Sequence, residues 1–303
     1  MQKILFIILF PMISFGQNVN IPDANFKNYL VNNTDINTNG DSEIQLIEAS
    51  SYTGTINCGW QNISDLTGIE AFTGLTQLFC FNNQLTSLDL SSNNALNIVE
   101  CTYNQLTSLN VSGCSALIQL GCSNNQLTSL NLSSNTALNI LHCSFNQISS
   151  IDLSSNNVLN ELYCSNNQLT SLDLSSNNAL TNLNCSFNIL NCLNLKNGNN
   201  INFSGFLVYN NQNLTCIEVD DVNSPTVINW INDNSNIDPQ HYFSEYCNNS
   251  CSNISSIFEL NNTSKQLIKI IDLLGIETQS KPNTPLLYIY NDGTVERKMI
   301  IKE

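Results

Sequence analysis

The sequence predicts a mainly β protein whose body is a solenoid of short parallel strands, with a small helical cap before it and a β-sandwich-like domain after it. The first observation behind this prediction is a strict period, because six cysteines recur at intervals of 21 residues and another precedes them by 22. These cysteines are Cys58, Cys80, Cys101, Cys122, Cys143, Cys164 and Cys185. The second observation is that apolar and polar residues alternate around each cysteine, as in a strand with one buried face. A period of this length without a helical pattern predicts one coil of a solenoid per repeat.

The N-terminal segment predicts an exported protein. MQKILFIILFPMISFGQ joins a short basic start to an apolar run and a small-residue exit at Ser14 and Gly16, which is typical of a secretory signal peptide. We therefore expect a signal peptide over residues 1–17. No later apolar run approaches the roughly 20 residues that a helix needs to cross a bilayer, so we expect no transmembrane segment.

Residues 18–55 are expected to form an N-terminal cap that contains a loop of unusual composition. The segment NTNGDSEIQLIE resembles a single calcium-binding loop, with oxygen ligands at its first, third, fifth and twelfth positions. The candidate ligands are Asn37, Asn39, Asp41 and Glu48. The first position is a neutral asparagine and the expected glycine is Ser42, which are departures from the pattern. Weak calcium binding and a relic loop that only caps the solenoid are the two alternatives.

Residues 56–200 are expected to form the solenoid, and each coil has two similar halves. LNILHCSFNQ has the pattern L-x-x-L-x-C-x-x-N, and LTSLDLSSNNA has L-x-x-L-x-L-x-x-N. The coils closely resemble the 21-residue bacterial leucine-rich repeats in which such halves alternate. The resemblance implies an extracellular binding or adhesion module. The asparagine after each cysteine is expected to form a hydrogen-bonded ladder along the stack.

Three roles are open for the cysteines of the period. A small buried hydrophobe suits a narrow coil interior, and this is the role that the sequence favours. Disulfides between coils would fit the distance between adjacent strands, but stacked side chains run parallel instead of facing one another. Zinc would need four converging ligands, which a straight row supplies only with distortion. Cys114 stands where other coils have an asparagine, and nothing in the sequence explains it.

Residues 201–254 break the period and are expected to form a C-terminal cap closed by a disulfide. The cysteines outside the period are Cys114, Cys192, Cys216, Cys247 and Cys251. An oxidising compartment favours pairing among the last four, with Cys216 to Cys247 as the favoured bond.

Residues 255–303 resemble the C-terminal sorting domain of the type IX secretion system. The motifs that carry the resemblance are KIIDLLG, LLYIYNDG and the final RKMIIKE, and their alternation predicts strands of a small β-sandwich. The resemblance implies recognition by the type IX secretion machinery and a location outside the cell or on the outer-membrane surface. The usual arginine after the glycine is Ile276, and the segment is shorter than typical. A plain β-domain that closes the solenoid is the alternative.

Charge and histidine content exclude several function classes. The formal net charge is −15, and a field of this sign repels phosphate backbones, so we expect no nucleic-acid partner. The chain has only two histidines, and alternation directs His142 outward while Cys143 points inward, which prevents a Cys–His catalytic pair. We expect no enzymatic activity and, apart from calcium, no cofactor.

The outward residues of the cysteine half are the candidate binding face. On the leucine half the outward residue is always Asp or Asn, whereas on the cysteine half it varies from coil to coil. The candidate ligand-binding residues are Phe79, Glu100, Tyr103, His142, Phe145 and Tyr163. Outward aromatic rings beside polar groups suit a protein interface or a sugar-stacking surface. The alternative is that some rings only cover the edge of the core.

Together these observations predict a secreted, surface-displayed module that binds an extracellular protein or polysaccharide through the cysteine half. A passive structural spacer or surface-layer scaffold without a specific ligand is the second hypothesis, because solenoids of this kind serve both purposes.

Overall fold

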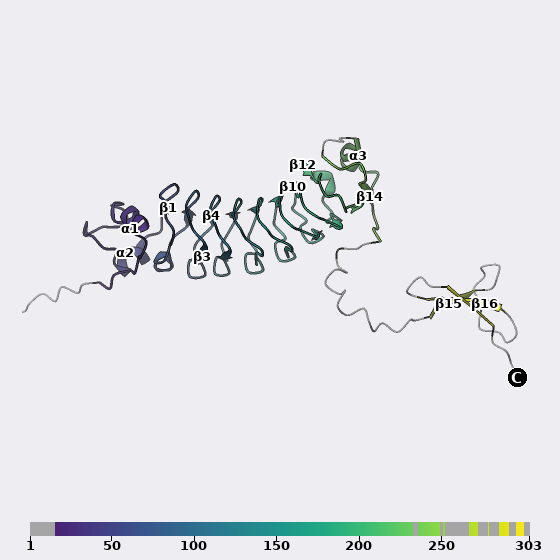
Figure 1. Ribbon diagram of the computed structural model, residues 1–303, viewed down its shortest axis with the longest axis horizontal. Helices are drawn as coiled ribbons and strands as arrows, with labels where there is room; N and C mark the ends of the chain where they lie inside the picture. The colour runs from purple at the N-terminus through teal and green to yellow at the C-terminus, as the bar shows by residue number, and fades with distance from the viewer. Residues whose placement is uncertain are drawn as a thin grey trace, which may run out of the picture. The chain divides into compact units, whose positions relative to one another are not determined.

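The structure is a computed structural model that describes residues 16–232, 236–248, 251, 267–271, 278, 285–290 and 295–299. The chain divides into two compact units, Met1–Ser252 and Asn253–Glu303. The first unit is a mainly β solenoid of parallel strands, which confirms the predicted architecture of the body (Figure 1). Residues 1–15 of the predicted signal peptide lie outside the described residues.

Two short helices form the N-terminal cap. The helix α1 (Ala24–Val31) begins at Asp23, whose Oδ1 accepts the backbone N–H groups of Asn25 and Phe26. Its apolar side chains Phe26 and Leu30 are fully buried. The second carboxylate oxygen of Asp23 accepts the N–H and hydroxyl of Ser64, so the start of this helix is bonded to the first coil. The helix α2 (Leu46–Ser51) follows the calcium-like loop.

The cysteine halves form one eight-stranded parallel sheet, in which each coil contributes one strand of three residues. The strands are β1 (Thr55–Asn57), β2 (Gln77–Phe79), β4 (Ile98–Glu100), β6 (Gln119–Gly121), β7 (Ile140–His142), β8 (Glu161–Tyr163), β10 (Asn182–Asn184) and β12 (Gly205–Leu207). The register follows the repeat, so that Leu120 lies beside Leu141 and Leu141 beside Leu162. Equivalent residues of successive coils therefore stack in columns along the solenoid.

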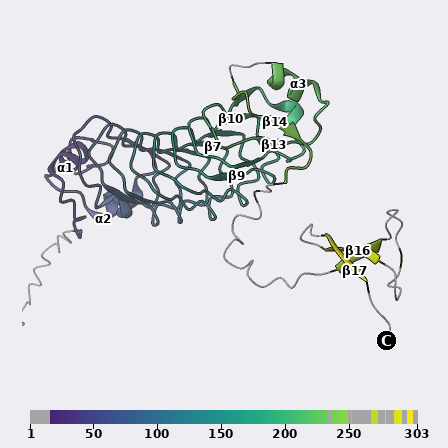
Figure 2. The same ribbon diagram turned by 45° about the vertical axis from the view of Figure 1, so that its right-hand side comes forward.

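The leucine halves form two shorter parallel sheets. β3 (Ser87–Asp89) pairs with β5 (Ser108–Asn110), and a four-stranded sheet contains β9 (Ser171–Asp173), β11 (Cys192–Asn194), β13 (Cys216–Glu218) and β14 (Tyr242–Ser244). Short 3-10 turns at Ile69–Ala71 (η1) and Asn200–Asn202 (η2) flank the coils. Parallel pairing thus continues beyond residue 200, and part of the segment expected to be a separate cap extends the stack (Figure 2).

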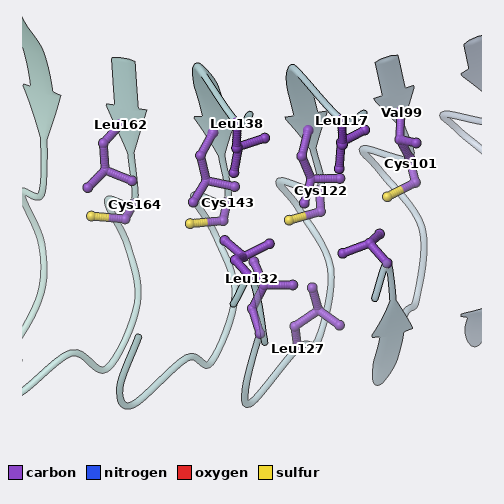
Figure 3. Packing of buried hydrophobic residues seen from close by; sticks show 14 of the residues in the cluster. Val99, Cys101, Leu117, Cys122, Leu127, Leu132, Leu138, Cys143, Leu162 and Cys164 are labelled. Atoms are coloured by element: carbon purple, nitrogen blue, oxygen red, sulfur yellow. The ribbon is translucent and has the colours of Figure 1, made fainter. Parts of the chain in front are cut away.

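The interior of each coil is filled by leucines and by the periodic cysteines, which are buried free thiols. The thiols of Cys101, Cys122, Cys143 and Cys164 form a row in which neighbours point the same way instead of toward one another (Figure 3). Burial raises the pKa of Cys143 and Cys185 to about 12, so these thiols are protonated at neutral pH. This arrangement confirms the favoured role of the cysteines as small apolar core residues.

The asparagine ladder binds backbone groups and not the neighbouring amides. The amide of Asn146 donates to the carbonyls of Cys122 in the preceding coil and of Cys143 and Ser144 in its own coil. Its Oδ1 accepts the N–H of Leu127, again in the preceding coil. The pattern recurs from coil to coil, so each turn of the cysteine half is closed and is tied to its neighbour by one buried side chain.

A second ladder explains Cys114. Asn93, Asn135, Asn156 and Asn177 are fully buried and donate to carbonyls of the preceding coil. Cys114 occupies the same column, and its thiol lies 3.4 Å from the carbonyl oxygen of Leu90. A thiol is a weak hydrogen-bond donor, and the Cys114 thiol reaches the same carbonyl position as the asparagine amides of the other coils. Cys114 therefore replaces one of the two hydrogen bonds that an asparagine makes here.

The C-terminal end of the solenoid is closed by two disulfides and an aromatic cluster. Cys216 is bonded to Cys247, the pair that the sequence favoured, and Cys192 is bonded to Cys251. The helix α3 (Pro225–Asn232) brings Trp230 against Phe206, with ring centroids 4.2 Å apart. Phe203 and Phe243 complete the cluster. These residues cover the last coil, and they protect a sheet edge that would otherwise be open.

The described residues of the second unit form three antiparallel strands, β15 (Leu267–Ile271), β16 (Pro285–Tyr290) and β17 (Val295–Met299). They include parts of the three sorting-domain motifs. Residues 291–293, which end the motif LLYIYNDG, lie outside the described residues.

We expect thiol titration to find eight free thiols per chain after denaturation without reductant, because eight cysteines are free and four form the two disulfides. In the native protein almost none should react, since reaction needs an accessible thiolate. A titration with Ellman's reagent, with and without guanidinium, measures both values. Fewer than eight thiols in freshly denatured protein would indicate disulfides between coils.

Replacement of Asn146 by alanine should lower the free energy of unfolding by about 2–4 kcal/mol, because buried backbone groups left without a partner cost about 1–3 kcal/mol each. The exposed neighbour Gln147 provides a control, and Gln147→Ala should change stability by less than about 0.5 kcal/mol. Urea unfolding of the full chain, followed by circular dichroism, tests this difference. Equal stability of the two variants would contradict the role of the ladder.

Candidate binding face

The two halves of the coil differ in what their outward side chains do. On the leucine half, each outward Asp or Asn accepts the backbone N–H two residues further on, as Asp89 does from Ser91 and Asp173 from Ser175. The uniformity of this side therefore has a structural cause, because a turn of this kind requires a short side chain with an acceptor oxygen. The cysteine half carries no such requirement at its outward column.

We define the strand face as the outward column formed by the last residue of each strand in the eight-stranded sheet. From β1 to β12 its members are Asn57, Phe79, Glu100, Gly121, His142, Tyr163, Asn184 and Leu207. The predicted binding residues Phe79, Glu100, His142 and Tyr163 thus belong to one column. Coils in parallel register lie about 4.8 Å apart, so side chains of adjacent coils are within contact distance.

Gly121 makes a gap in the middle of the strand face, and Glu100 leans into this gap. A Cβ atom at Gly121 would collide with the carboxylate of Glu100. Burial raises the pKa of the Glu100 carboxyl above its ordinary value, against the opposing effects of the Thr102 N–H and of nearby His142. A half-buried carboxylate with one ordinary backbone partner retains acceptor capacity for a ligand donor.

His142 is held in place by residues of the next coil. Its Nε2 lies 2.9 Å from Oε1 of Glu161, and its ring stacks on Tyr163 with centroids 4.7 Å apart and an angle of 5° between the planes. The side chain points outward as predicted, but it is partnered and half-buried, so it is not a free surface histidine. Fixed orientation lowers the entropy that this ring and Tyr163 would lose on binding a partner.

Neither histidine can pair with a periodic thiol. The ring of His142 contacts Glu161 and Tyr163 on the outward side of the sheet, whereas Cys143 is buried in the interior. His241 is buried in the C-terminal cap, where its Nδ1 accepts the N–H of Asp238 and its Nε2 contacts the carbonyl of Asn211. Burial lowers the pKa of His241, which is consistent with a neutral structural ring.

A second set of residues, which we name the turn row, lies two positions past each cysteine and at the matching position after Val208. Its members have left-handed backbone with φ between 52° and 62°. In stacking order they are Trp60, Asn82, Tyr103, Asn124, Phe145, Asn166, Phe187 and Asn210. Asparagine is common in this conformation, whereas a bulky L residue is strained there by about 1–2 kcal/mol. Aromatic residues and asparagines therefore alternate strictly along a strained position.

The rings of the turn row are largely exposed. The exposed fractions are 70% for Trp60, 57% for Tyr103, 53% for Phe145 and 45% for Phe187. The rings of Phe187 and of Tyr209 in the next coil pack edge to face, with their centroids 5.2 Å apart. Part of the Phe187 ring therefore covers the turn. Only the buried part of each ring can serve to cover the core. Trp60 and Phe187 join the predicted Tyr103 and Phe145, and the alternation with asparagine is the sequence signal that identifies all four.

The calcium-like loop is held closed by its own hydrogen bonds. Glu48 Oε1 accepts the N–H groups of Thr38 and Asn39 and the Thr38 hydroxyl, while Oε2 accepts the N–H of Gln45. Asn37 bonds the backbone of Val31 and Asp41, and Asn39 bonds Asp41 and Gln45. The four predicted ligands are thus brought together, but a cation would have to displace chain donors from Glu48. The capping alternative accounts for these bonds, and calcium binding stays a prediction.

Two absences among the described residues concern other classes of site. In this part of the chain no three side chains of His, Cys, Asp or Glu gather in a way that suits a metal ion. No described helix combines the length and apolar character that a membrane crossing needs.

Comparison with known proteins agrees with this geometry. The family model for the leucine-rich-repeat domain of endo-β-N-acetylglucosaminidase EndoS matches residues 42–157. The chain therefore has a leucine-rich-repeat fold. Its repeats are also similar to internalin J of Listeria monocytogenes serotype 4b, with 41% identity over 73 residues. That match spans 24% of this leucine-rich-repeat chain and 8% of internalin J.

A solved structure also has this fold. Internalin C2 of Listeria monocytogenes is 21% identical, with a TM-score of 0.55 over 75% of this chain and 97% of that chain. The functional domain of internalin J, which includes a cysteine ladder, is 26% identical and has a TM-score of 0.37, covering 70% of this chain and 60% of that chain. The likeness to internalin C2 supports the leucine-rich-repeat fold and does not identify a ligand.

We expect Trp60→Asn to leave the free energy of unfolding unchanged or to raise it by up to about 1 kcal/mol, because asparagine relieves left-handed strain. Trp60→Ala keeps the strain and removes the same ring, so it should be about 1 kcal/mol less stable than the asparagine variant. Urea unfolding of the two variants measures the difference. A marked loss of stability in Trp60→Asn would show that the ring holds the first coil together.

Proposed function

We propose that this leucine-rich-repeat protein is a secreted, surface-displayed binding module without catalytic activity of its own, and that it recognises an extracellular macromolecule through the cysteine half of its coils. The observation that carries the proposal is the contrast between the two sides. Outward side chains of the leucine half are fixed by turn geometry, whereas those of the strand face vary from coil to coil. Variation within a regular scaffold is what a specific ligand requires of a repeat protein.

The chemistry of the strand face suits recognition. The Glu100 carboxylate borders the gap at Gly121, and the stacked pair of His142 and Tyr163 lies on its other side. Aromatic rings with a few oriented polar groups are the usual composition of a binding hot spot. The thiols lie in the interior and are protonated, so the face offers no activated nucleophile.

The route to the surface is part of the same proposal. The signal-peptide pattern would start export, and the C-terminal segment would be recognised by the type IX secretion machinery. Two disulfides in the cap are consistent with an oxidising destination. Deletion of residues 255–303 should then keep the protein in the periplasm of a host with this machinery.

Loss of the strand face should abolish specific binding. The test compares the full-length protein with a Phe79→Ala, His142→Ala, Tyr163→Ala variant on arrays of extracellular proteins and glycans. Any specific protein ligand should bind the variant at least about tenfold more weakly, because truncation of hot-spot residues commonly costs more than about 1 kcal/mol each. The matched control is Asp89→Asn, Asp152→Asn, Asp173→Asn on the leucine half, where Asn110, Asn131 and Asn194 already occupy the same column.

Two results would contradict the proposal. Full binding of a protein ligand by the strand-face variant would place its recognition elsewhere in the chain. The scaffold hypothesis would instead be supported if neither the wild type nor the control variant bound any ligand.

A further inference from the structure

The turn row has a period of two coils, although the solenoid repeats every coil. The N–H groups of Trp60, Tyr103, Phe145 and Phe187 each bond a carbonyl of the following coil, and so do those of the intervening asparagines. The row is therefore one hydrogen-bonded ladder, and its coils lie about 4.8 Å apart. Successive rings are separated by two coils, or about 10 Å. A ligand that used all four rings would have to be extended and would have to repeat at this interval.

The residues on either side of each ring in the chain are uncharged, and among the described residues only two carboxylates bond the row or a residue next to it: Glu100 accepts the N–H of Thr102, and Asp238 accepts the N–H of Asn210. The positions on either side of the turn row hold serine, threonine, glycine, aromatic residues, asparagine and glutamine in every coil from the first to the seventh. The exposed glutamines Gln84, Gln105, Gln126, Gln147 and Gln168 run parallel to the row. A strip with so few charges stands out on a chain with a net charge of −15. Charge complementarity therefore favours an uncharged polymer over a basic or acidic one.

The energetics of the row favour a role other than folding. Asparagine occupies the same left-handed position in every second coil, so the backbone does not need an aromatic residue there. Each aromatic member combines a strained backbone with a ring that is about half exposed or more. Strain that local packing does not require is typical of functional positions. Exposed rings flanked by amide side chains offer stacking surfaces together with hydrogen-bond donors and acceptors.

We propose that the turn row binds an extended, uncharged β-1,4-linked polysaccharide, with one aromatic ring stacking on every second sugar. In such a chain alternate sugars are turned over, so the same face recurs at each disaccharide, which is close to the separation of the rings. Amide groups of Asn82, Asn124 and Asn166 lie at the intervening coils, where the other sugars would present their hydroxyl groups. The inference rests on the proposed function, because it places the ligand on the cysteine half.

The test uses the full chain and two kinds of probe. Cellulose and chitin microcrystals measure retention on a polymer, and soluble β-1,4 oligosaccharides from disaccharide to octasaccharide measure length dependence by calorimetry. We expect affinity to increase with each added disaccharide until the chain spans the four rings. Amylose and polygalacturonate, which are α-linked and, in the second case, charged, should not bind.

The variant that tests the row is Trp60→Asn, Tyr103→Asn, Phe145→Asn, Phe187→Asn. It makes every coil like its asparagine neighbours, so it should fold. Retention should fall at least about tenfold, because the loss of hot-spot aromatic rings weakens binding on this scale. The control is Tyr246→Asn, an exposed aromatic residue outside the row with 79% of its surface accessible. The double variant Trp60→Asn, Phe187→Asn keeps only the two inner rings. It should still bind short oligosaccharides, but its affinity should no longer increase with the longer ones.

The outcomes separate this inference from the proposed function. No binding of the wild type to any β-1,4 probe, or full retention by the four-residue variant, would overturn the polysaccharide inference. If a protein ligand were found at the same time and the strand-face variant no longer bound it, the proposed function would stand without the polysaccharide inference. If β-1,4 probes bound and every turn-row and strand-face variant retained them, both would fail.

Discussion

The structure depends on hydrogen bonds that buried asparagine side chains make to the backbone. A coil with three-residue strands leaves many peptide groups outside any sheet, and each of them would be costly if it were buried without a partner. Asn146 and its equivalents satisfy several such groups at once, in their own coil and in the preceding one. Stacking and closure of the turns are therefore one interaction. Narrow coils then leave room for a cysteine where the other half of the coil has a leucine.

The cysteines show how geometry selects among the roles that a residue type permits. Neighbouring coils bring equivalent cysteines close enough for disulfides, yet parallel stacking points their thiols in one direction. Outside the stack, Cys216 and Cys247 approach from different elements and are bonded. The same chain thus keeps eight thiols reduced and four cysteines paired without any difference in redox environment.

Much of the fold and part of the site could be predicted from the sequence, because both follow from periodicity. The coil length, the inward cysteines and the outward column of Phe79, Glu100, His142 and Tyr163 are direct consequences of alternation on a fixed repeat. Contacts between coils could not be predicted in this way. The pairing of His142 with Glu161, the carboxylate beside Gly121 and the role of Cys114 depend on which residue the stack places next to which.

Alternation along the turn row implies that its phase is kept only when coils are gained or lost in pairs. Repeat arrays grow and shrink by unequal duplication, and a single extra coil preserves the core because each coil is bonded only to its neighbours. Such an insertion would nevertheless bring two aromatic or two asparagine turns together and shift every later ring out of phase. Duplication of two coils would conserve both the core and the phase. Relatives that differ in length should therefore retain the alternation more often when they differ by an even number of coils.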